Sequence, residues 1–222
     1  MKAIKKKRPT LPKYTTVWDV DTVLDYLDTI DTNTATPAVL TEKTAMLLSL
    51  ITAPRGKELF IMRSDLIGLT EDIATFFFTQ QAKHSNPGDT CEEISIHKFE
   101  NNPNLCPLTT LNSYLQLSKP WREANKETAL FLTTIEPHSA AQKSTIAGWV
   151  KDILGKAGIN TEAFQAHSVR GASTSKAHKQ GLSLEDVLKR GHWTNKSTWQ
   201  KFYHKPISSA SQRYQDKILE NR

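Results

Sequence analysis

The last quarter of the chain holds side chains whose types and spacing could supply the parts of one reaction. His167 and Arg170 are three residues apart, so both project from one face if the segment is helical. Gly191-His192-Trp193 follows, and Tyr203 stands in a short stretch rich in Lys, Trp and Phe. Arg and His side chains can bind a phosphate, and a tyrosine hydroxyl can attack one. Basic and aromatic surroundings suit a nucleic-acid backbone.

Further candidates precede these residues. An apolar run ends at Arg55, and Glu58 follows three residues later. Residues 72–98 predict two strands joined by a turn that holds Lys83 and Asn86-Pro87-Gly88. The order along the chain is therefore an Arg, a hairpin Lys, His-x-x-Arg, a His/Trp pair and a Tyr.

These five elements in this order resemble the catalytic domain of tyrosine recombinases, also called phage integrases. The resemblance covers about Thr41 to Pro206, most of the chain. Arg55-Gly56-Lys57-Glu58-Leu59 is similar to the first-arginine box of that family, and Lys83 stands where the family places its hairpin lysine. His167-Ser168-Val169-Arg170 resembles the H-x-x-R box, and Tyr203 resembles the nucleophile.

The flanking sequence is closest to recombinases of eukaryotic mobile elements, the DIRS-type retrotransposons and Cryptons. The stretches that carry this resemblance are Pro12-Lys13-Tyr14, Trp18-Asp19-Val20, Ala166-His167-Ser168, Thr174-Ser175-Lys176-Ala177 and Lys201-Phe202-Tyr203. A mobile element of a eukaryote implies that the protein acts in the nucleus, and any other origin implies the cytoplasm.

Attack by a tyrosine on DNA forms a phosphotyrosyl intermediate and conserves the bond energy, so we expect neither a cofactor nor a metal ion. The transition state gathers charge on the two non-bridging oxygens, which fixed guanidinium groups stabilise. We assign this role to Arg55 and Arg170, because a guanidinium matches two oxygens at once. Taken alone, Arg55 is more typical of a helix-end surface residue that pairs with Glu58, and only the other four elements favour the functional role.

The proton transfers follow from the resemblance. His167 resembles the family's proton acceptor for Tyr203, and a tyrosine hydroxyl needs one because its free pKa is about 10. Lys83 would donate a proton to the 5′-oxygen leaving group, and Glu58 would orient Arg55. Alternatively, His167 only binds the backbone at a helix start, and Lys83 is only a solvated turn residue.

The chain departs from the family pattern at Gly191-His192-Trp193. The family has a glycine directly before a His or Trp that binds phosphate, and here both rings are present. Alignment through Ser197-Thr198 makes Trp193 the phosphate ligand and places His192 where the family has glycine. Alignment on the Gly-His pair makes His192 the ligand instead. We favour Trp193, and one of the two rings can also be a simple packing residue.

Charge and composition suit a DNA partner. The net charge of the 222 residues is +6, and residues 151–222 carry 13 Lys/Arg against 6 Asp/Glu. The basic surplus therefore coincides with the reactive residues, as phosphate contacts require. Cys91 and Cys106 lack the spacing of a zinc site and are expected to be free thiols.

No signal peptide and no membrane-spanning stretch are expected, because the basic N-terminus lacks an apolar core and no apolar run is long enough. Lys5-Lys6-Lys7-Arg8 suits a nuclear address, a phosphate-binding arm or a solvated terminus.

Hydrophobic periodicity predicts a mainly α-helical protein with a small antiparallel β-sheet, an α+β fold. The resemblance divides the chain into an arm, one helix and a linker (1–36), a catalytic domain (37–206) and a tail (207–222). Helices are expected over about 17–31, 40–53, 55–63, 107–117, 142–156, 168–179, 184–189 and 197–203, and a short buried strand over 129–133. Family members carry an N-terminal clamp domain, whereas only the helix expected over 17–31 precedes the catalytic part here, so we expect either a fragment or a chain that has lost the clamp.

We conclude that the sequence predicts the catalytic domain of a DNA recombinase acting on double-stranded DNA. The resemblance implies self-association into a tetramer on DNA, with Ser208–Leu219 packing between protomers. One alternative is a type IB topoisomerase, which shares the chemistry but acts as a monomer. The other is a domesticated DNA-binding protein without activity. The flanking sequence argues against the first, and the presence of all five elements argues against the second.

Overall fold

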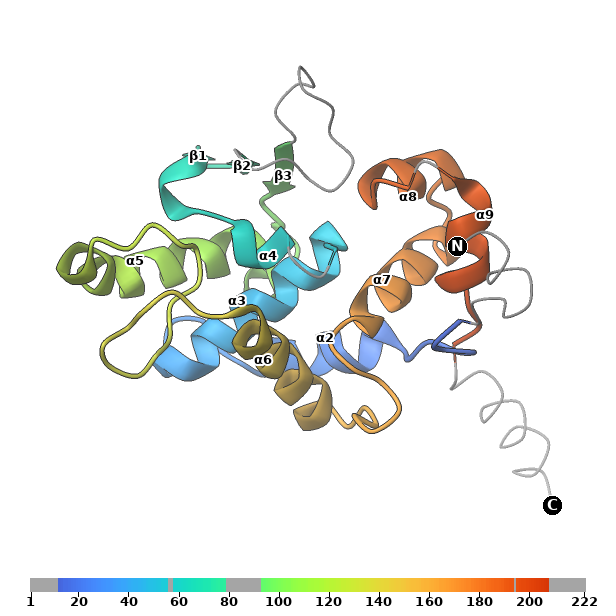
Figure 1. Ribbon diagram of the computed structural model, residues 1–222, viewed down its shortest axis with the longest axis horizontal. Coiled ribbons are helices and arrows are strands. Elements are labelled where there is room, and N and C mark those ends of the chain that lie inside the picture. The colour runs from blue at the N-terminus through green and yellow to red at the C-terminus, as the bar shows by residue number, and fades with distance from the viewer. Residues whose placement is uncertain (1–11, 56–57, 79–92, 194, 208–222) are drawn as a thin grey trace, which may run out of the picture.

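The computed structural model describes residues 12–55, 58–78, 93–193 and 195–207 (Figure 1). Helices make up most of this part of the chain, and a small antiparallel sheet lies on one side of them. The helices are α2 (Val20–Asp28), α3 (Pro37–Thr52), α4 (Glu58–Ile61), α5 (Pro107–Asn125), α6 (Lys143–Lys156), α7 (Ser168–Lys179), α8 (Leu184–Arg190) and α9 (Lys196–Phe202). The strands are β1 (Ile67–Leu69), β2 (Ile73–Phe77) and β3 (Glu93–His97). The predicted fold class is confirmed.

Helix α3 lies at the centre of the molecule, and α5, α6 and α7 pack around it (Figure 1). Its residues are buried over most of its length, as expected for a helix enclosed on several sides. Four hydroxyl side chains fit this apolar setting because each donates a hydrogen bond to the carbonyl four residues earlier in the helix. They are Thr41, Thr44, Ser49 and Thr52.

The sheet has the order β1-β2-β3, with both pairs antiparallel. Ala74 and Phe76 of β2 and Ile94 and Ile96 of β3 alternate with more exposed residues and form its buried face. The two predicted strands are confirmed within the described residues. Strand β1 was not predicted, because three residues are too few to show an alternating pattern.

Three other predictions are corrected. The segment 129–133 is buried but forms only isolated bridges, Arg63 with Ala129 and Leu132 with Ala140. Arg122 donates to the carbonyls of Ala129 and Leu130, which therefore bind a side chain in place of a neighbouring strand. Among the described residues, the helix predicted over 55–63 is limited to α4, and a separate 3-10 turn, Ser64–Leu66, follows it. Helix α5 runs past its predicted end through Pro120 to Asn125.

The last three helices stand together at one end of the molecule (Figure 1), and α7 packs against both α3 and α8. Two of these helices start at a side-chain cap: Ser183 caps α8 and Asn195 caps α9. Among the described residues, no helix combines the length and apolar character that crossing a bilayer requires.

Lys43 of α3 is an unusual core residue, because its side chain is fully buried. Its ammonium group donates to the Ile30 carbonyl and, at 3.0 Å, to the Thr32 hydroxyl. Burial lowers the pKa of Lys43 to about 8, although the negative charges of Asp28 and Asp31 act in the opposite direction. Lys43 thereby ties the chain after α2 to the central helix.

We predict that the free energy of unfolding rises between pH 8 and 10.5. Over that range the folded protein has released the Lys43 proton while the unfolded chain, with the ordinary pKa of 10.5, still holds it. Lys43→Met should remove this rise and should cost about 1–3 kcal/mol at neutral pH, because the Ile30 carbonyl loses its donor. Urea unfolding of both proteins across this pH range measures the two effects. Parallel curves for the two proteins would contradict the prediction.

Candidate active site

Helix α7 begins directly after His167, so His167 and Arg170 stand one turn apart at its start. Ser168, the first helical residue, is held from outside the helix, because the indole N–H of Trp18 donates to its hydroxyl oxygen at 2.8 Å. Both His167 and Arg170 line one cavity of about 280 Å³, together with Arg55 and Lys143. The helical spacing read from the sequence therefore brings the two side chains to one site.

Arg170 is 2% exposed, and no carboxylate lies among its hydrogen-bond acceptors in the described residues. Its two terminal nitrogens donate to the carbonyls of Ala53, at the end of α3, and Gly191, at the end of α8. Burial lowers the pKa of Arg170 to about 10, against the opposing influence of Tyr203 and Glu58, so the group stays charged at neutral pH. Helix ends favour a cation, because their carbonyl groups point outward.

Arg55 lies two residues after Ala53, and its side chain is 29% exposed. Glu58 accepts the backbone N–H of Arg55 at 2.7 Å, and its other oxygen lies 4.0 Å from the Arg55 guanidinium. The guanidinium also donates to the His192 carbonyl. Glu58 therefore fixes the chain and the charge of Arg55 at the same time, as a partner that orients it would.

The turn after α8 supplies one carbonyl acceptor to each of the two arginines. The N–H groups of His192 and Trp193 donate back to the carbonyls of Lys189 and Leu188, at 3.0 and 2.9 Å, in the pattern of a Schellman cap. His192 takes the left-handed conformation, with φ of 50°. A side chain at Gly191 would meet the Trp193 ring at 1.8 Å, so only glycine fits there.

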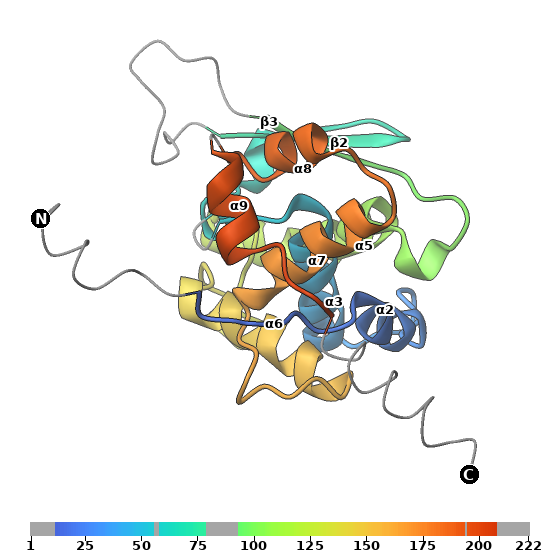
Figure 2. The same ribbon diagram turned by 90° about the vertical axis from the view of Figure 1, so that its right-hand side faces the viewer.

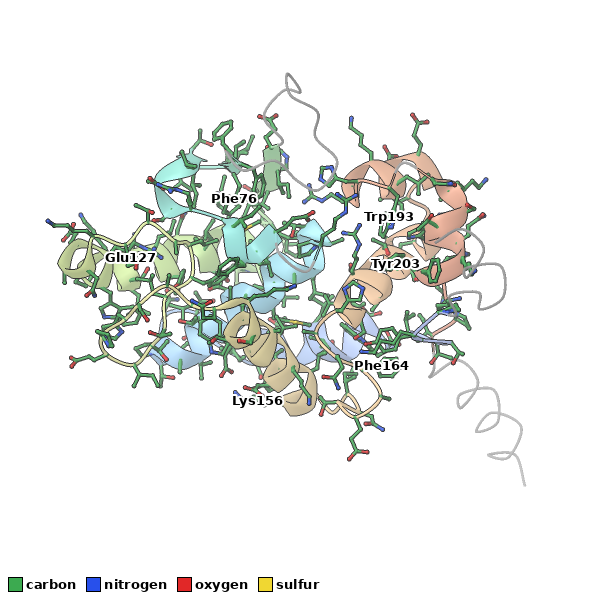
Figure 3. All side chains as sticks on the ribbon, in the orientation of Figure 1. Phe76, Glu127, Lys156, Phe164, Trp193 and Tyr203 are labelled. Carbon is green, nitrogen blue, oxygen red and sulfur yellow. The ribbon has the colours of Figure 1, made fainter. Side chains whose placement is uncertain are left out.

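Tyr203 ends α9 and packs among the other candidates (Figure 3). Its ring centroid lies 4.8 Å from that of Trp193 and 6.0 Å from that of His167. The Arg170 guanidinium sits 3.9 Å above the Trp193 ring and 5.6 Å from the Tyr203 ring, within cation–π range. The Ser175 hydroxyl donates to the Tyr203 carbonyl at 2.8 Å and fixes the backbone of this residue to α7.

His167 stands at the solvent-facing side of this group. Its surroundings lower the pKa of the imidazole, first by desolvation and then through the positive charges of Arg170, Lys13 and Lys143. A lowered pKa keeps the ring neutral at physiological pH, and only a neutral imidazole can accept a proton.

The structure thus gathers Arg55, His167, Arg170, Trp193 and Tyr203 at one place, with Glu58 behind Arg55. Lys83 lies outside the described residues. His192 contributes its backbone carbonyl to Arg55, while the residue itself lines a separate groove between α3, α7 and α8. The roles assigned to these residues stay predictions.

Sequence reasoning missed Arg190, which fixes the turn from behind. Its guanidinium donates to the Ile51 carbonyl of α3 at 2.9 Å and reaches the Ser95 carbonyl of β3 at 3.4 Å. An arginine in the last turn of a helix is common, so its sequence position gave no signal. Lys13 and Lys143 were also missed, because only the fold places their charges beside His167.

No three His, Cys, Asp or Glu side chains in the described part of the chain gather closely enough to hold a metal ion. The arrangement instead combines fixed cations, a neutral imidazole and a tyrosine, which are groups suited to transfer of a phosphoryl group to a hydroxyl.

Comparison with known proteins agrees with this class of site. The family model described as phage integrase family matches residues 14–208, and the chain belongs to that family. A comparison with curated proteins finds no match.

Several solved structures share the fold. The XerH site-specific recombinase bound to difH substrate matches with a TM-score of 0.62 at 15% identity, over 95% of this chain and 56% of that one. The XerA recombinase gives 0.62 at 19% identity, over 97% and 68% of the two chains. A lambda integrase dimer bound to a COC′ core site gives 0.54 at 15% identity, over 94% and 66%. The chain thus spans little more than half the length of the XerH recombinase.

We predict that His192→Gly unfolds at higher denaturant concentration than His192→Ala. Both substitutions remove the imidazole, but only glycine takes the left-handed conformation without strain, which costs other residues about 1 kcal/mol or more. Urea unfolding of the two variants measures the difference in unfolding free energy. Equal stability of the two, or a more stable alanine variant, would contradict the left-handed turn.

Proposed function

We propose that this protein is the catalytic domain of a site-specific DNA recombinase, which cleaves and rejoins double-stranded DNA through a 3′-phosphotyrosyl intermediate. The observation that carries the proposal is the packing of the Tyr203 ring against Trp193 and His167, with the Arg170 guanidinium above. In a chain of the phage integrase family, this is where a nucleophile needs a proton acceptor and a phosphate-binding cation.

In this reaction the Tyr203 oxygen attacks the scissile phosphorus, and the bond from phosphorus to the 5′-oxygen breaks. His167 takes the phenolic proton, for which its lowered pKa suits it. Lys83 gives a proton to the departing oxygen. No bond energy is lost, so the 5′-hydroxyl of another strand can reverse the step and join to the phosphate.

Arg55 and Arg170 stabilise the charge on the non-bridging oxygens. A guanidinium has five N–H donors, and the carbonyls of Ala53 and Gly191 accept from two nitrogens of Arg170. Each arginine therefore keeps further N–H donors for a phosphate, while the carbonyls fix the orientation of its guanidinium plane. Such preorganisation is the largest catalytic contribution in many enzymes.

Trp193 is our choice for the additional phosphate ligand. Its ring touches both Arg170 and Tyr203, whereas His192 occupies the left-handed position that glycine normally fills. The indole N–H would donate to a non-bridging oxygen.

The finer identity is also proposed from the sequence. The flanking stretches around Trp18, His167 and Tyr203 support descent from a DIRS-type or Crypton mobile element, and hence action in the nucleus. We propose that residues 37–206 form the catalytic domain, with 1–36 and 207–222 as accessory segments. DNA as substrate is supported by the XerH and lambda integrase structures, which are complexes with difH and COC′ DNA.

The central test uses a nicked DNA duplex whose cleavage releases a short fragment, so that the adduct cannot religate. The wild-type protein should give a denaturant-stable protein–DNA band on a gel, because Tyr203 becomes joined to the 3′-phosphate. Tyr203→Phe should give no band while binding the same DNA with unchanged affinity. The matched control is Tyr214→Phe, which removes the other tyrosine near the chain end and should keep the band.

Absence of an adduct with the wild-type protein, on DNA that it binds, would favour the non-catalytic DNA-binding alternative. A band that persists in Tyr203→Phe would place the nucleophile elsewhere. Relaxation of supercoiled DNA without exchange between two sites would favour the topoisomerase alternative.

Replacing Arg55 and replacing Arg170 should both slow cleavage but should differ in their effect on the melting temperature. Arg55→Ala should slow cleavage by about 10²-fold or more with little change in melting temperature, because its side chain is partly exposed. Arg170→Ala should also melt earlier, because it leaves two buried carbonyls without donors. Single-turnover cleavage and thermal melting measure these effects. Arg63→Ala, at a surface pair with Asp65, is the control and should cleave normally.

We also propose self-association on DNA, as a tetramer, through the tail that follows Pro206. Its apolar residues Ile207, Tyr214, Ile218 and Leu219 are spaced to form one stripe if the segment is helical. Ile207 pairs with Val17 in a bridge, and residues 208–222 lie outside the described part of the chain. Deleting residues 208–222 should leave the melting temperature unchanged and should reduce the mass of the protein–DNA assembly measured by light scattering. A truncated protein that assembles on DNA like the full chain would exclude the tail from assembly.

A further inference from the structure

The segment from Lys13 to Trp18 contacts two parts of the site that are far from it in the sequence. Figure 2 shows it, in dark blue, meeting the red segment that follows α9. The Val17 N–H donates to the Pro206 carbonyl at 2.8 Å, and Val17 forms a parallel bridge with Ile207. One residue later, the Trp18 indole donates to the Ser168 hydroxyl at 2.8 Å. Val17 thus binds the chain that follows Tyr203, and its neighbour Trp18 binds Ser168, the residue directly after His167.

These contacts are buried. Val17 is 3% exposed and Trp18 2%, and both belong to the main hydrophobic core. Gly171 of α7 shows how closely the parts meet: a Cβ placed there would lie 3.6 Å from the Val17 side chain and 3.7 Å from the Tyr203 carbonyl. Val17 and the backbone of the nucleophile therefore rest on the same stretch of α7.

The start of the segment lies against His167. The Tyr14 ring packs on Phe164 with centroids 5.7 Å apart, and its hydroxyl accepts the Gln165 N–H at 3.4 Å. Lys13 lines a cavity of about 150 Å³ with His167 and Tyr203, and its charge acts on the imidazole. The segment thus lies along the edge of the site, beside both His167 and Tyr203.

We propose that residues 13–18 position the nucleophile and its proton acceptor relative to each other, and that Trp18 is the central positioning residue. The inference rests on the proposed cleavage reaction. Trp18 bonds to Ser168, beside His167, and Val17 holds the chain three residues beyond Tyr203, so this segment fixes the separation of the two reacting side chains. Attack requires that separation to be held closely, since a misplacement of about 1 Å can cost about 10²-fold in rate.

Trp18→Phe tests the proposal, because it deletes the indole N–H and keeps most of the ring. We expect the single-turnover rate of adduct formation to fall about tenfold, while the affinity for the same DNA stays within about twofold, because the segment acts on positioning. Ser168→Ala removes the acceptor of the same bond and should slow cleavage by the same factor. The double variant should be no slower than the slower single variant.

Trp149→Phe is the matched control. Trp149 is a more exposed tryptophan that packs against the core away from residues 13–18, edge-on to Phe131, and its replacement should leave the cleavage rate unchanged. The proposal would be overturned if the double variant lost rate by the product of the two single losses. It would also be overturned if the Trp18→Phe protein cleaved as fast as wild type.

Lys13→Gln provides a readout that lost stability alone would not move. Its charge disfavours protonation of His167, so the variant should shift the acid limb of the pH–rate profile to higher pH. If the acid limb of the pH–rate profile does not shift, residues 13–18 do not act on His167 during the reaction, and the proposal is overturned. A wild-type protein that forms no adduct overturns the proposed function instead, so the two failures are distinguishable.

Discussion

The site depends on one buried cation that is held by main-chain carbonyls. Arg170 cannot be solvated at 2% exposure, and a charge in that setting is tolerated only where strong acceptors surround it. The carbonyls of Ala53 and Gly191 meet this need, and because they end two different helices, the guanidinium joins α3 to α8. Because the Arg170 charge must be paired, it holds together the ends of α3 and α8, next to which the other candidate residues lie.

Other contacts extend this arrangement. Arg55 binds the next carbonyl of the same turn, and Arg190 ties the end of α8 to α3 and to the sheet. The Trp193 ring fills the space between Arg170 and Tyr203, and it leaves no room for a side chain at Gly191. Arg55, Arg170 and Trp193 are therefore held in place by the backbone of this turn and by contacts with one another.

The sequence predicted what depends on local pattern. The face shared by His167 and Arg170 follows from helical spacing, and the start of α8 follows from the cap at Ser183. It did not predict the strand β1 or the pairing of residues 129–133, because these depend on distant partners such as Arg122. Contacts between elements, including the bond from Trp18 to Ser168 across 150 positions, carry no periodic signal.

The reliance on backbone acceptors also bears on how such a protein can diverge. A carbonyl oxygen is present whichever amino acid occupies a position, so substitutions at Ala53 or His192 keep the atom that an arginine needs as long as the turn persists. Selection then acts on backbone shape at these places and on side-chain identity at few others, among them Gly191. This freedom gives a physical reason why chains at 15–19% identity retain the same fold, as the XerH and XerA structures do. The sequence of such a chain can thus change at these positions while the backbone geometry that surrounds the cation persists.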